Sequence, residues 1–488
     1  MIKRLLHILL IIPGLLLSQT QIGTDIIGEA LNDQSGISIS LSNDGSIIAI
    51  GANQNDGIAI SAGHVRIFQN ISGTWTQIGT DIDGVALADN AGYSVSLSGN
   101  GNIVAIGTIG DDSAGLNAGQ VRIYQNISGT WTQIGAGING EAADDRFGFK
   151  VSLSDNGSVV AIGAQFNNGN GSNAGHVRIY QNISGTWTQI GTDIDGDAVN
   201  DQFGASISLS IDGKIIAIGA IGNDSNGFAS GHVKIFQNIL GTWTQIGTNI
   251  KGEAAGDQSG VSVSLSGNGN IVAIGAYLND GSGSNAGHVR IYKNILGTWT
   301  QIGTDIDGEA VDDNSGRNVS LSSDGSVIAI GAPLNDGSGS NAGHVRIYQN
   351  ISGTWTQIGV DIDGTGVDYE SGKTVSLSSD GNIVAIGAFG SSGFYTGQVR
   401  IFNITSVLSN NEFVIENFSI YPNPVSTTLT IQLQNNLELN TVTIYDSLSK
   451  TIKETNSKVL HMNTLAKGIY YIKVTTNKGT ATKMIIKK

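Results

Sequence analysis

Residues 75–79 read WTQIG, and these five letters recur every 56 residues through most of the chain. The tryptophans that open the copies are Trp75, Trp131, Trp187, Trp243, Trp299 and Trp355. One interval before the first of them stands Gln19, and residues 20–23 again read TQIG. The sequence therefore contains seven copies of one unit, of which the first begins at the N-terminal edge of the repeats.

Each unit contains four short runs that are typical of β-strands. In the sixth unit they are residues 316–322 (GRNVSLS), 326–332 (SVIAIGA), 343–349 (GHVRIYQ) and 355–362 (WTQIGVDI), here called strands a to d. A sheet with two partly apolar faces and no helix to cover them must stack against its neighbours. We therefore predict an all-β fold in which residues 19–405 form a seven-bladed β-propeller with four-stranded blades.

The seventh unit has strands a (372–378), b (382–388) and c (397–402), but no WTQIG follows them. Residues 20–26 are a strand d without the other three strands of a unit. We predict that this N-terminal strand completes the last blade, which would remove the exposed edges of an open array.

The first 18 residues are typical of an export signal. Lys3 and Arg4 precede an apolar run from Leu5 to Leu17, which is shorter than the ~20 residues needed to span a bilayer. We predict a cleavable signal peptide at residues 1–18, entry into the periplasm, and no transmembrane segment in the mature chain. The absence of cysteine excludes disulfides, thiolate metal sites, a cysteine nucleophile and a lipoprotein anchor.

Strands a to c resemble a known repeat. Residues 201–208 read DQFGASIS, and residues 330–333 (IGAP) precede 343–348 (GHVRIY). This pattern resembles the FG-GAP repeats of integrin-alpha-like propellers, a family that includes adhesion receptors. Integrin-type repeats carry a calcium loop between strands a and b, whereas residues 42–45 (SNDG) are a two-residue hairpin turn, so calcium is not expected at that link.

The two ends of an antiparallel blade differ in this sequence. The a–b and c–d links are tight turns, whereas the b–c and d–a links are loops of about ten residues. We call the end with these loops the long-loop face. Its d–a links hold 24 of the 40 acidic residues, and residues 19–410 hold 14 basic and 35 acidic residues. This field disfavours nucleic acid and anionic lipid, and it favours cations or basic partners.

The acidic loops have two interpretations. The first is that Asp and Asn-Gly form turns and keep a secreted protein soluble. The second is calcium binding by the d–a loops, because Ca²⁺ takes oxygen ligands held by sharp glycine turns. The candidate ligands are Asp193, Asp195, Asp197, Asp201, Asp305, Asp307, Glu309, Asp312 and Asp313. Calcium is the only cofactor that the sequence suggests.

Three sets of residues were weighed as functional and as structural. We expect the tryptophans to pack between sheets, a row of sugar-binding rings being the alternative. The histidines that begin strand c are too far apart around the ring to share one metal, so a structural role is expected (His64, His176, His232, His288 and His344). The residues that break the repeat are scattered in sequence and suggest no catalytic residues (Arg146, Lys150, Lys251, Arg317, Tyr369 and Tyr395).

After a linker at residues 406–413 the repeat gives way to a different composition. Residues 420–424 (IYPNP), 429–431 (LTI) and 468–474 (GIYYIKV) resemble type A C-terminal sorting domains of type IX secretion. The resemblance implies that residues 414–488 engage the outer-membrane type IX secretion machinery and are then cleaved. Short alternating strands predict a small immunoglobulin-like β-sandwich, a carbohydrate-binding sandwich being the alternative.

We expect a monomeric, non-enzymatic binding or adhesion module that is secreted or held on the outer cell surface. Its ligand would be an extracellular protein or glycan that binds the acidic long-loop face. The alternative is an extracellular glycan hydrolase or lyase built on the propeller.

Overall fold

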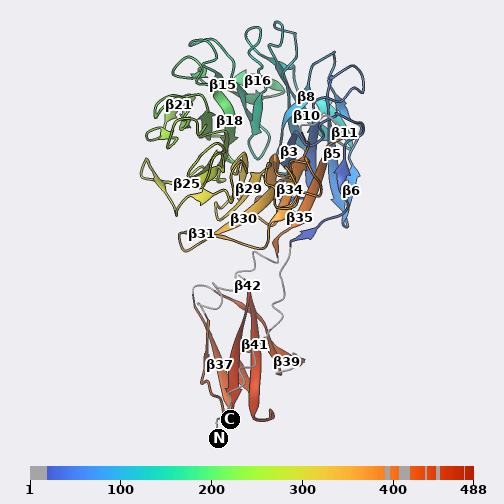
Figure 1. Cartoon of the computed structure of the whole chain (residues 1–488). Coiled ribbons are helices and arrows are strands. Elements are labelled where there is room, and N and C mark those ends of the chain that lie inside the picture. Colours follow the sequence, from blue (N-terminus) through green and yellow to red (C-terminus); the bar gives the residue numbers. More distant parts are fainter. Residues whose placement is uncertain (1–18, 391–395, 406–417, 435–436, 447–450, 478) are drawn as a thin grey trace. The chain divides into compact units, whose positions relative to one another are not determined.

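A computed structural model describes residues 19–390, 396–405, 418–434, 437–446, 451–477 and 479–488. The predicted signal peptide (1–18) and linker (406–413) lie outside the described residues. The chain divides into two compact units at residue 404, and its elements are strands β1 to β42. Among the described residues, no helix has the length and apolar character needed to span a membrane. The predicted all-β propeller is confirmed, and Figure 1 shows its sheets arranged around a common axis.

The described residues of the first unit form seven antiparallel sheets. The innermost strands (a) are β3 (Ser38–Leu41), β8 (Ala91–Leu97), β13 (Lys150–Leu153), β18 (Phe203–Leu209), β23 (Ser262–Leu265), β28 (Asn318–Leu321) and β33 (Thr374–Leu377). The second strands (b) are β4 (Ile47–Ala52), β9 (Ile103–Thr108), β14 (Val159–Ala164), β19 (Ile215–Ala220), β24 (Ile271–Ala276), β29 (Val327–Ala332) and β34 (Ile383–Ala388). The third strands (c) are β5 (His64–Ile71), β10 (Gln120–Ile127), β15 (His176–Ile183), β20 (His232–Ile239), β25 (His288–Ile295), β30 (His344–Ile351) and β35 (Gln398–Asn403).

Strand d is divided into two short strands, both of which pair with strand c. The longer ones are β6 (Thr74–Gln77), β11 (Thr130–Gln133), β16 (Thr186–Gln189), β21 (Thr242–Gln245), β26 (Thr298–Gln301) and β31 (Thr354–Gln357). The shorter ones are β7 (Ile82–Asp83), β12 (Ile138–Asn139), β17 (Ile194–Asp195), β22 (Ile250–Lys251), β27 (Ile306–Asp307) and β32 (Ile362–Asp363). We number the blades 1 to 7 by their innermost strands, so that β3–β7 form blade 1 and β28–β32 form blade 6.

The innermost strands contact one another in chain order, and β33 of blade 7 contacts β3 of blade 1, so the ring is closed. The outer edge of blade 7 is formed by β1 (Thr20–Gln21) and β2 (Ile26–Ile27), which pair with β35. The N-terminal strand therefore completes the last blade, as the sequence predicted.

The hydrophobic cores lie between neighbouring blades. In one of them, Val289 and Ile291 of β25 pack against Ile328 and Ile330 of β29, all 1% exposed or less. The blades come so close that a Cβ on Gly275 would lie 2.0 Å from the carbonyl oxygen of the next blade's strand a. Strand b is therefore covered on both faces.

The tryptophans join adjacent blades through hydrogen bonds. Trp355 Nε1 donates to Ile302 O of the preceding blade at 3.0 Å, and the other five tryptophans do the same at 2.9 Å. Gly303 has a φ of 77°, and a Cβ there would lie 2.8 Å from Trp355 Cδ1. The space that the tryptophan needs is why strand d is interrupted where the sequence predicted one continuous strand.

The second unit contains two sheets around one core. One sheet is β36 (Phe418–Tyr421), β37 (Thr428–Leu433) and β40 (Val459–His461). The other is β38 (Leu439–Tyr445), β39 (Thr451–Thr455), β41 (Gly468–Thr476) and β42 (Gly479–Lys487). Both sheets contribute to the shared core, for example Leu429 and Val442. A two-sheet sandwich agrees with the sequence, and its immunoglobulin-like topology stays a prediction.

Candidate functional site

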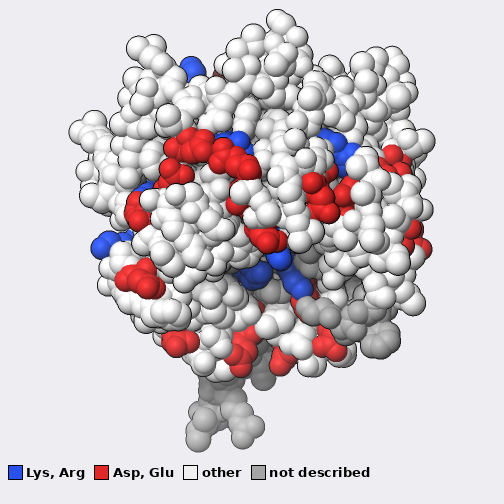
Figure 2. All heavy atoms as spheres, turned by 90° about the horizontal axis from the view of Figure 1, so that it is seen from above, with Lys and Arg blue, Asp and Glu red and all other residues white. Residues whose placement is uncertain are grey.

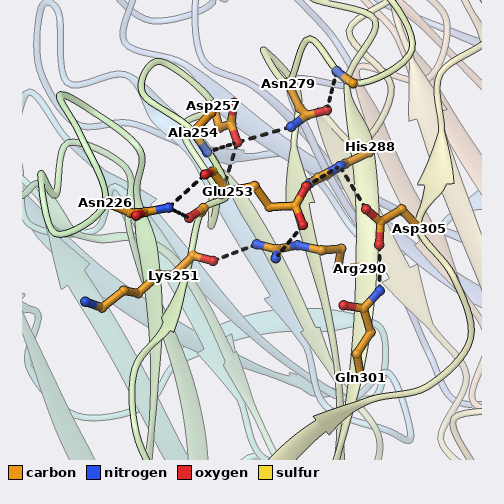
Figure 3. Close-up of polar contacts among 12 residues, drawn as sticks. Asn226, Lys251, Glu253, Ala254, Asp257, Asn279, His288, Arg290, Gln301 and Asp305 are labelled. Atoms are coloured by element: carbon orange, nitrogen blue, oxygen red, sulfur yellow. Dashed lines mark hydrogen bonds and ion pairs between the residues drawn. The ribbon is translucent and has the colours of Figure 1, made fainter.

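The d–a links of the long-loop face are each folded around a buried aspartate. Asp257 is 2% exposed and accepts hydrogen bonds from the backbone N–H groups of Glu253 (3.1 Å) and Ala254 (2.9 Å). It also accepts from Asn279 Nδ2 of the b–c loop at 3.1 Å, as Figure 3 shows. The recurring aspartate therefore ties the two long loops of one blade together, which holds the face in a defined shape.

Two of the predicted calcium ligands have this capping role. Asp201 and Asp313 accept backbone hydrogen bonds within their own links and side-chain bonds from Asn223 and Asn335. Asp312 accepts from Asn285 Nδ2 at 2.9 Å. These carboxylates already have protein donors.

The other predicted calcium ligands contact different side chains. Asp193 and Asp305 each face a histidine, Glu309 lies beside Arg346, and Asp197 pairs with Lys234 at 2.5 Å. The two remaining ligands are Asp195 and Asp307, where burial and then the preceding aspartate raise the pKa. The structure does not gather the nine residues around one point, and calcium binding by the d–a loops stays a prediction.

The structure groups the strand-c histidines with acids from two blades. His288 begins β25, and its side chain is 2% exposed. Its Nδ1 lies 3.7 Å from Asp305 Oδ2 of the same blade and 3.9 Å from Glu253 Oε2 in the link from blade 4 (Figure 3). Its Nε2 is buried without a hydrogen-bond partner among the described residues.

This His–Glu–Asp group occurs four times among the described residues. The four groups are Glu29–His64–Asp81, Glu141–His176–Asp193, Glu253–His288–Asp305 and Glu309–His344–Asp361. No two histidines share a group, which agrees with the expectation that ring neighbours are too far apart. The sequence analysis missed these groups because it considered the acids and the histidines separately. The signal was present, since Glu recurs 35 residues before His in all four units.

The histidines are neutral at physiological pH. Burial, and next the nearby Arg290 guanidinium, lowers the pKa of His288 to about 4 despite the carboxylate of Asp305. The same two causes, with Arg178 as the cation, lower the pKa of His176 to about 4. Each imidazole therefore presents a neutral ring to two carboxylates.

The arginine two residues after the histidine fixes one of those carboxylates. Arg290 donates from one terminal nitrogen to Lys251 O at 2.7 Å and from the other to Glu253 Oε1 at 3.3 Å. It also lies over the ring of Tyr292. Arg178 makes the same two contacts in blade 3, with Glu141 Oε1 at 3.3 Å and Asn139 O at 2.7 Å.

A second set of residues lies at the propeller axis. At the other end of strand a, leucines from the blades line one axial pocket, among them Leu97 and Leu153. Because side chains alternate along a strand, the residues four positions earlier also face the axis, at the long-loop end. They are Ile37, Tyr93, Phe149, Ala205, Val261, Arg317 and Lys373.

The aromatic residues of this ring contact one another and a basic side chain. The Tyr93 and Phe149 ring centroids are 5.1 Å apart, and the Phe149 and Phe166 centroids are 6.1 Å apart. The Arg146 guanidinium lies 5.1 Å from the centroid of Phe166. These rings are partly exposed, and Arg146 is exposed.

Basic side chains from different blades influence one another's charge at the long-loop end of the axis. Burial, and then the charge of Arg317 from blade 6, lowers the pKa of Lys150 in blade 3 to about 8. Burial raises the pKa of Tyr93, against the opposing effect of Arg317 and Arg146. We call Tyr93, Arg146, Phe149, Lys150 and Arg317 the axial cluster. In Figure 2, Lys and Arg side chains gather near the middle of the view beside a hollow, with Asp and Glu side chains around them.

The axial cluster corrects one expectation from the sequence. Arg146, Lys150 and Arg317 break the repeat and are scattered in sequence, yet in the closed ring Arg317 influences the pKa of Lys150, and Arg317 and Arg146 influence that of Tyr93. Lys251 lies elsewhere, with its Nζ 3.4 Å from Ser225 O, and Tyr369 lies against Gly366 of its own loop. Tyr395 lies outside the described residues.

Two family models match parts of the chain. The model of the FG-GAP repeat matches residues 139–180 and 251–292, and that of the secretion system C-terminal sorting domain matches residues 419–488. The chain carries FG-GAP repeats and a type IX sorting domain. The sorting domain indicates export by type IX secretion to the cell surface or the extracellular space, and it implies interaction with the type IX machinery. The FG-GAP matches lie in blades 2 to 5, at links and strands that repeat in the other blades.

Solved structures with a similar fold include two proteins of low sequence identity. Hydrazine synthase from Kuenenia stuttgartiensis aligns with a TM-score of 0.50 at 12% identity, over 77% of this chain and 97% of that chain. A protein named as a 6-phosphogluconolactonase from Bacteroides uniformis aligns with a TM-score of 0.49 at 13% identity, over 67% of this chain and 85% of that chain. Identities this low concern the fold alone. A comparison with curated proteins gives no match.

Proposed function

We propose that this exported FG-GAP propeller is a non-enzymatic binding module whose axial cluster holds the acidic end of an extracellular glycan. The observation that carries the proposal is the electrostatic influence of Arg317 on Lys150, and of Arg317 and Arg146 on Tyr93, beside partly exposed aromatic rings. Ligand sites in proteins combine apolar and aromatic walls with a few convergent polar groups, and this cluster has that composition.

The basic groups define the charged part of the ligand. A guanidinium forms paired hydrogen bonds with a carboxylate, which makes arginine the preferred partner of acidic ligands. An anion would also offset the charge of Arg317, which, after burial, is the second cause that lowers the pKa of Lys150. The Tyr93 and Phe149 rings supply flat apolar faces for the C–H groups of a sugar ring.

The acidic loops around the cluster limit how much negative charge a ligand can carry. The d–a links hold 24 acidic residues, so a long polyanion lying across the face would meet repulsion. A chain that ends in one uronic acid would place its single carboxylate at the axis and leave neutral sugars at the rim. The acidic loops would thus repel ligands that carry many negative charges, and the axial cluster would bind the ligand.

A titration of the full-length protein with two ligands tests the proposal. The probes are a disaccharide that ends in glucuronic acid and the methyl ester of the same compound, followed by isothermal titration calorimetry. We expect the acid to bind and the neutral ester to bind at least about tenfold more weakly, the effect of one charge-assisted hydrogen bond. Equal binding of acid and ester, or no binding of either, would reject the proposal.

The repeat itself supplies matched variants. Arg317→Val restores the residue that blade 5 has at Val261, and Lys150→Ser restores the residue that blade 2 has at Ser94. Lys214→Ser removes one positive charge from an exposed a–b turn at the opposite end, where the side chain is 68% exposed. We expect the first two variants to lose most of the affinity and the third to bind like the native protein.

One observation favours a second function, a uronic acid lyase. A lysine with a pKa of about 8 can accept a proton near neutral pH, and Arg317 could neutralise the carboxylate beside the carbon that loses the proton. Elimination would then break the glycosidic bond and leave a conjugated double bond in the product. Ultraviolet absorbance of that product, formed by the native protein and not by Lys150→Ser, would replace the binding proposal with this one.

A further inference from the structure

We propose that the propeller binds divalent transition-metal ions, with zinc as the best fit, at the four His–Glu–Asp groups between its blades. This proposal is independent of the glycan site, because the groups lie on strand c and the d–a links, not at the axis. Each group would hold one ion through histidine Nδ1, one oxygen of the glutamate and one oxygen of the aspartate.

The spacing of the three atoms fits one shared ion. Zinc bonds of 2.0–2.2 Å place tetrahedral ligand atoms roughly 3.3–3.6 Å apart. In three groups the Nδ1-to-carboxylate distances are 3.4–3.9 Å, and in the fourth His344 Nδ1 lies 3.7 Å from Asp361. All the ligand atoms of a group lie within 4.8 Å of one another. Most of these distances are too long for a hydrogen bond, so the carboxylates surround the imidazole nitrogen without bonding to it.

His344 is the clearest case of a group whose imidazole nitrogen lacks a hydrogen-bond partner among the described residues. Its side chain is 1% exposed, and its Nδ1 is buried without a hydrogen-bond partner among the described residues. That nitrogen faces Asp361 Oδ2 at 3.7 Å. A buried polar atom without a partner is unfavourable, and a metal ion shared with the two carboxylates would satisfy it.

The neighbours of each group hold the free oxygens toward the histidine. In blade 5, Gln301 Nε2 donates to Asp305 Oδ1 at 2.6 Å, and Arg290 binds Glu253 Oε1. In both carboxylates one oxygen is thus occupied, and the other faces Nδ1 (Figure 3). The same glutamine-to-aspartate bond occurs in the other three groups. Outer-shell donors of this kind orient the ligands of metal sites.

The blades without the group have lost more than one of its members. In blade 2, glutamine replaces the histidine, and the equivalents of the two acids are Val85 and Gly137. In blade 7, Gln398 replaces the histidine and Thr365 the glutamate, and the two side chains bond to each other. The members are not lost as a set, because blade 7 keeps Asp25 at the aspartate position and blade 4 keeps His232.

The chemistry of the donors selects the metal class. Calcium and magnesium prefer oxygen ligands alone, whereas an imidazole with two carboxylates suits zinc and neighbouring first-row ions. The glutamates are 45–49% exposed, so an ion can enter from solvent. Three protein ligands leave a fourth position for water.

Zinc titration of the full chain after chelator treatment and dialysis tests the proposal. We expect four zinc ions per chain by calorimetry and by elemental analysis, the number of groups in the described residues. Each of the substitutions H64Q, H176Q, H288Q and H344Q should remove one ion, and the fourfold variant should bind none in the propeller. Glutamine is the residue of blades 2 and 7, so these variants keep a side chain that the fold accepts.

His232 is the matched control. It begins the same strand in blade 4, but its equivalents of the two acids are Asp197, which pairs with Lys234, and Asn249. We expect H232Q to retain all four ions. Zinc binding below one ion per chain, an unchanged count in the fourfold variant, or calcium binding in place of zinc would each overturn the proposal.

Discussion

We expect Lys150 to lower the free energy of unfolding of the propeller. Blades 1, 2, 4 and 5 have serine at this position, and Ser94 Oγ donates to Gly148 O of the next blade at 2.6 Å. Lys150 instead places an amino group where burial, and then the charge of Arg317, lowers its pKa to about 8. Positions that oppose folding in this way are concentrated at functional sites.

Lys150→Ser should therefore stabilise the propeller at pH 7. The folded-state pKa of about 8 lies below the ordinary value of 10.5, so folding disfavours the charged lysine, and native stability rises as pH increases from 8 to 10.5. For a partly exposed group we expect a gain of about 2 kcal/mol at pH 7 and almost none at pH 10.5. Urea unfolding of both proteins at the two pH values measures it, and an equal difference at both values would contradict the assignment.

The capping aspartates make a second residue-scale prediction. Asp257→Ala leaves two backbone N–H groups and Asn279 without their acceptor, which should cost about 2 kcal/mol of unfolding free energy. Asp312→Asn is the control, because that side chain is exposed and asparagine tolerates the φ of 64° there, so the expected cost is below about 0.5 kcal/mol. Equal effects in the two variants would show that the buried aspartate does not hold the loop.

At the scale of the element, the sequence predicted the strands well because their signal is local and repeated seven times. The interruption of strand d was missed because its cause, the Trp355 ring beside Gly303, comes from the next blade. At position 19, where the other blades have tryptophan, Gln19 donates from Nε2 to Val360 O at 2.7 Å and joins blade 7 to blade 6.

The closing strands are an element whose removal should be severe. Deleting residues 19–27, with residues 1–18 kept for export, removes β1, β2 and the buried Ile26, and it exposes the edge of β35. We expect a loss of at least about 3 kcal/mol and a marked fall in melting temperature. Ile26→Ala should lie between this variant and the native protein, and a deletion that melts like the native protein would refute the closure.

At the scale of the whole molecule, the propeller and the sorting domain are separate compact units. Removing residues 419–488 should leave the melting transition of the propeller unchanged, because its cores lie between its own blades. The truncated protein should remain in the periplasm, since the matched sorting domain is gone. Cell fractionation measures this, and normal appearance of the truncated protein in the medium would contradict the role of the domain.

The candidate sites needed the closed ring, which is why the sequence alone did not reveal them. Tyr93, Lys150 and Arg317 belong to blades 2, 3 and 6 and meet only when the ring closes around its axis. Glu253 and His288 lie in different blades and meet only across an interface. The repeat predicted which positions are equivalent in the seven blades. Which residues of different blades become neighbours depends on how the ring closes, and the repeat does not show this.

The central functional claim is that the residues that break the repeat form a binding site at the axis. Difference electron density from a crystal soaked with the glucuronic acid disaccharide tests it most directly. We expect the carboxylate between Arg317 and Lys150 and a sugar ring against Tyr93 or Phe149. Density on the acidic rim or at the tight-turn end, with the axis free of ligand, would contradict it.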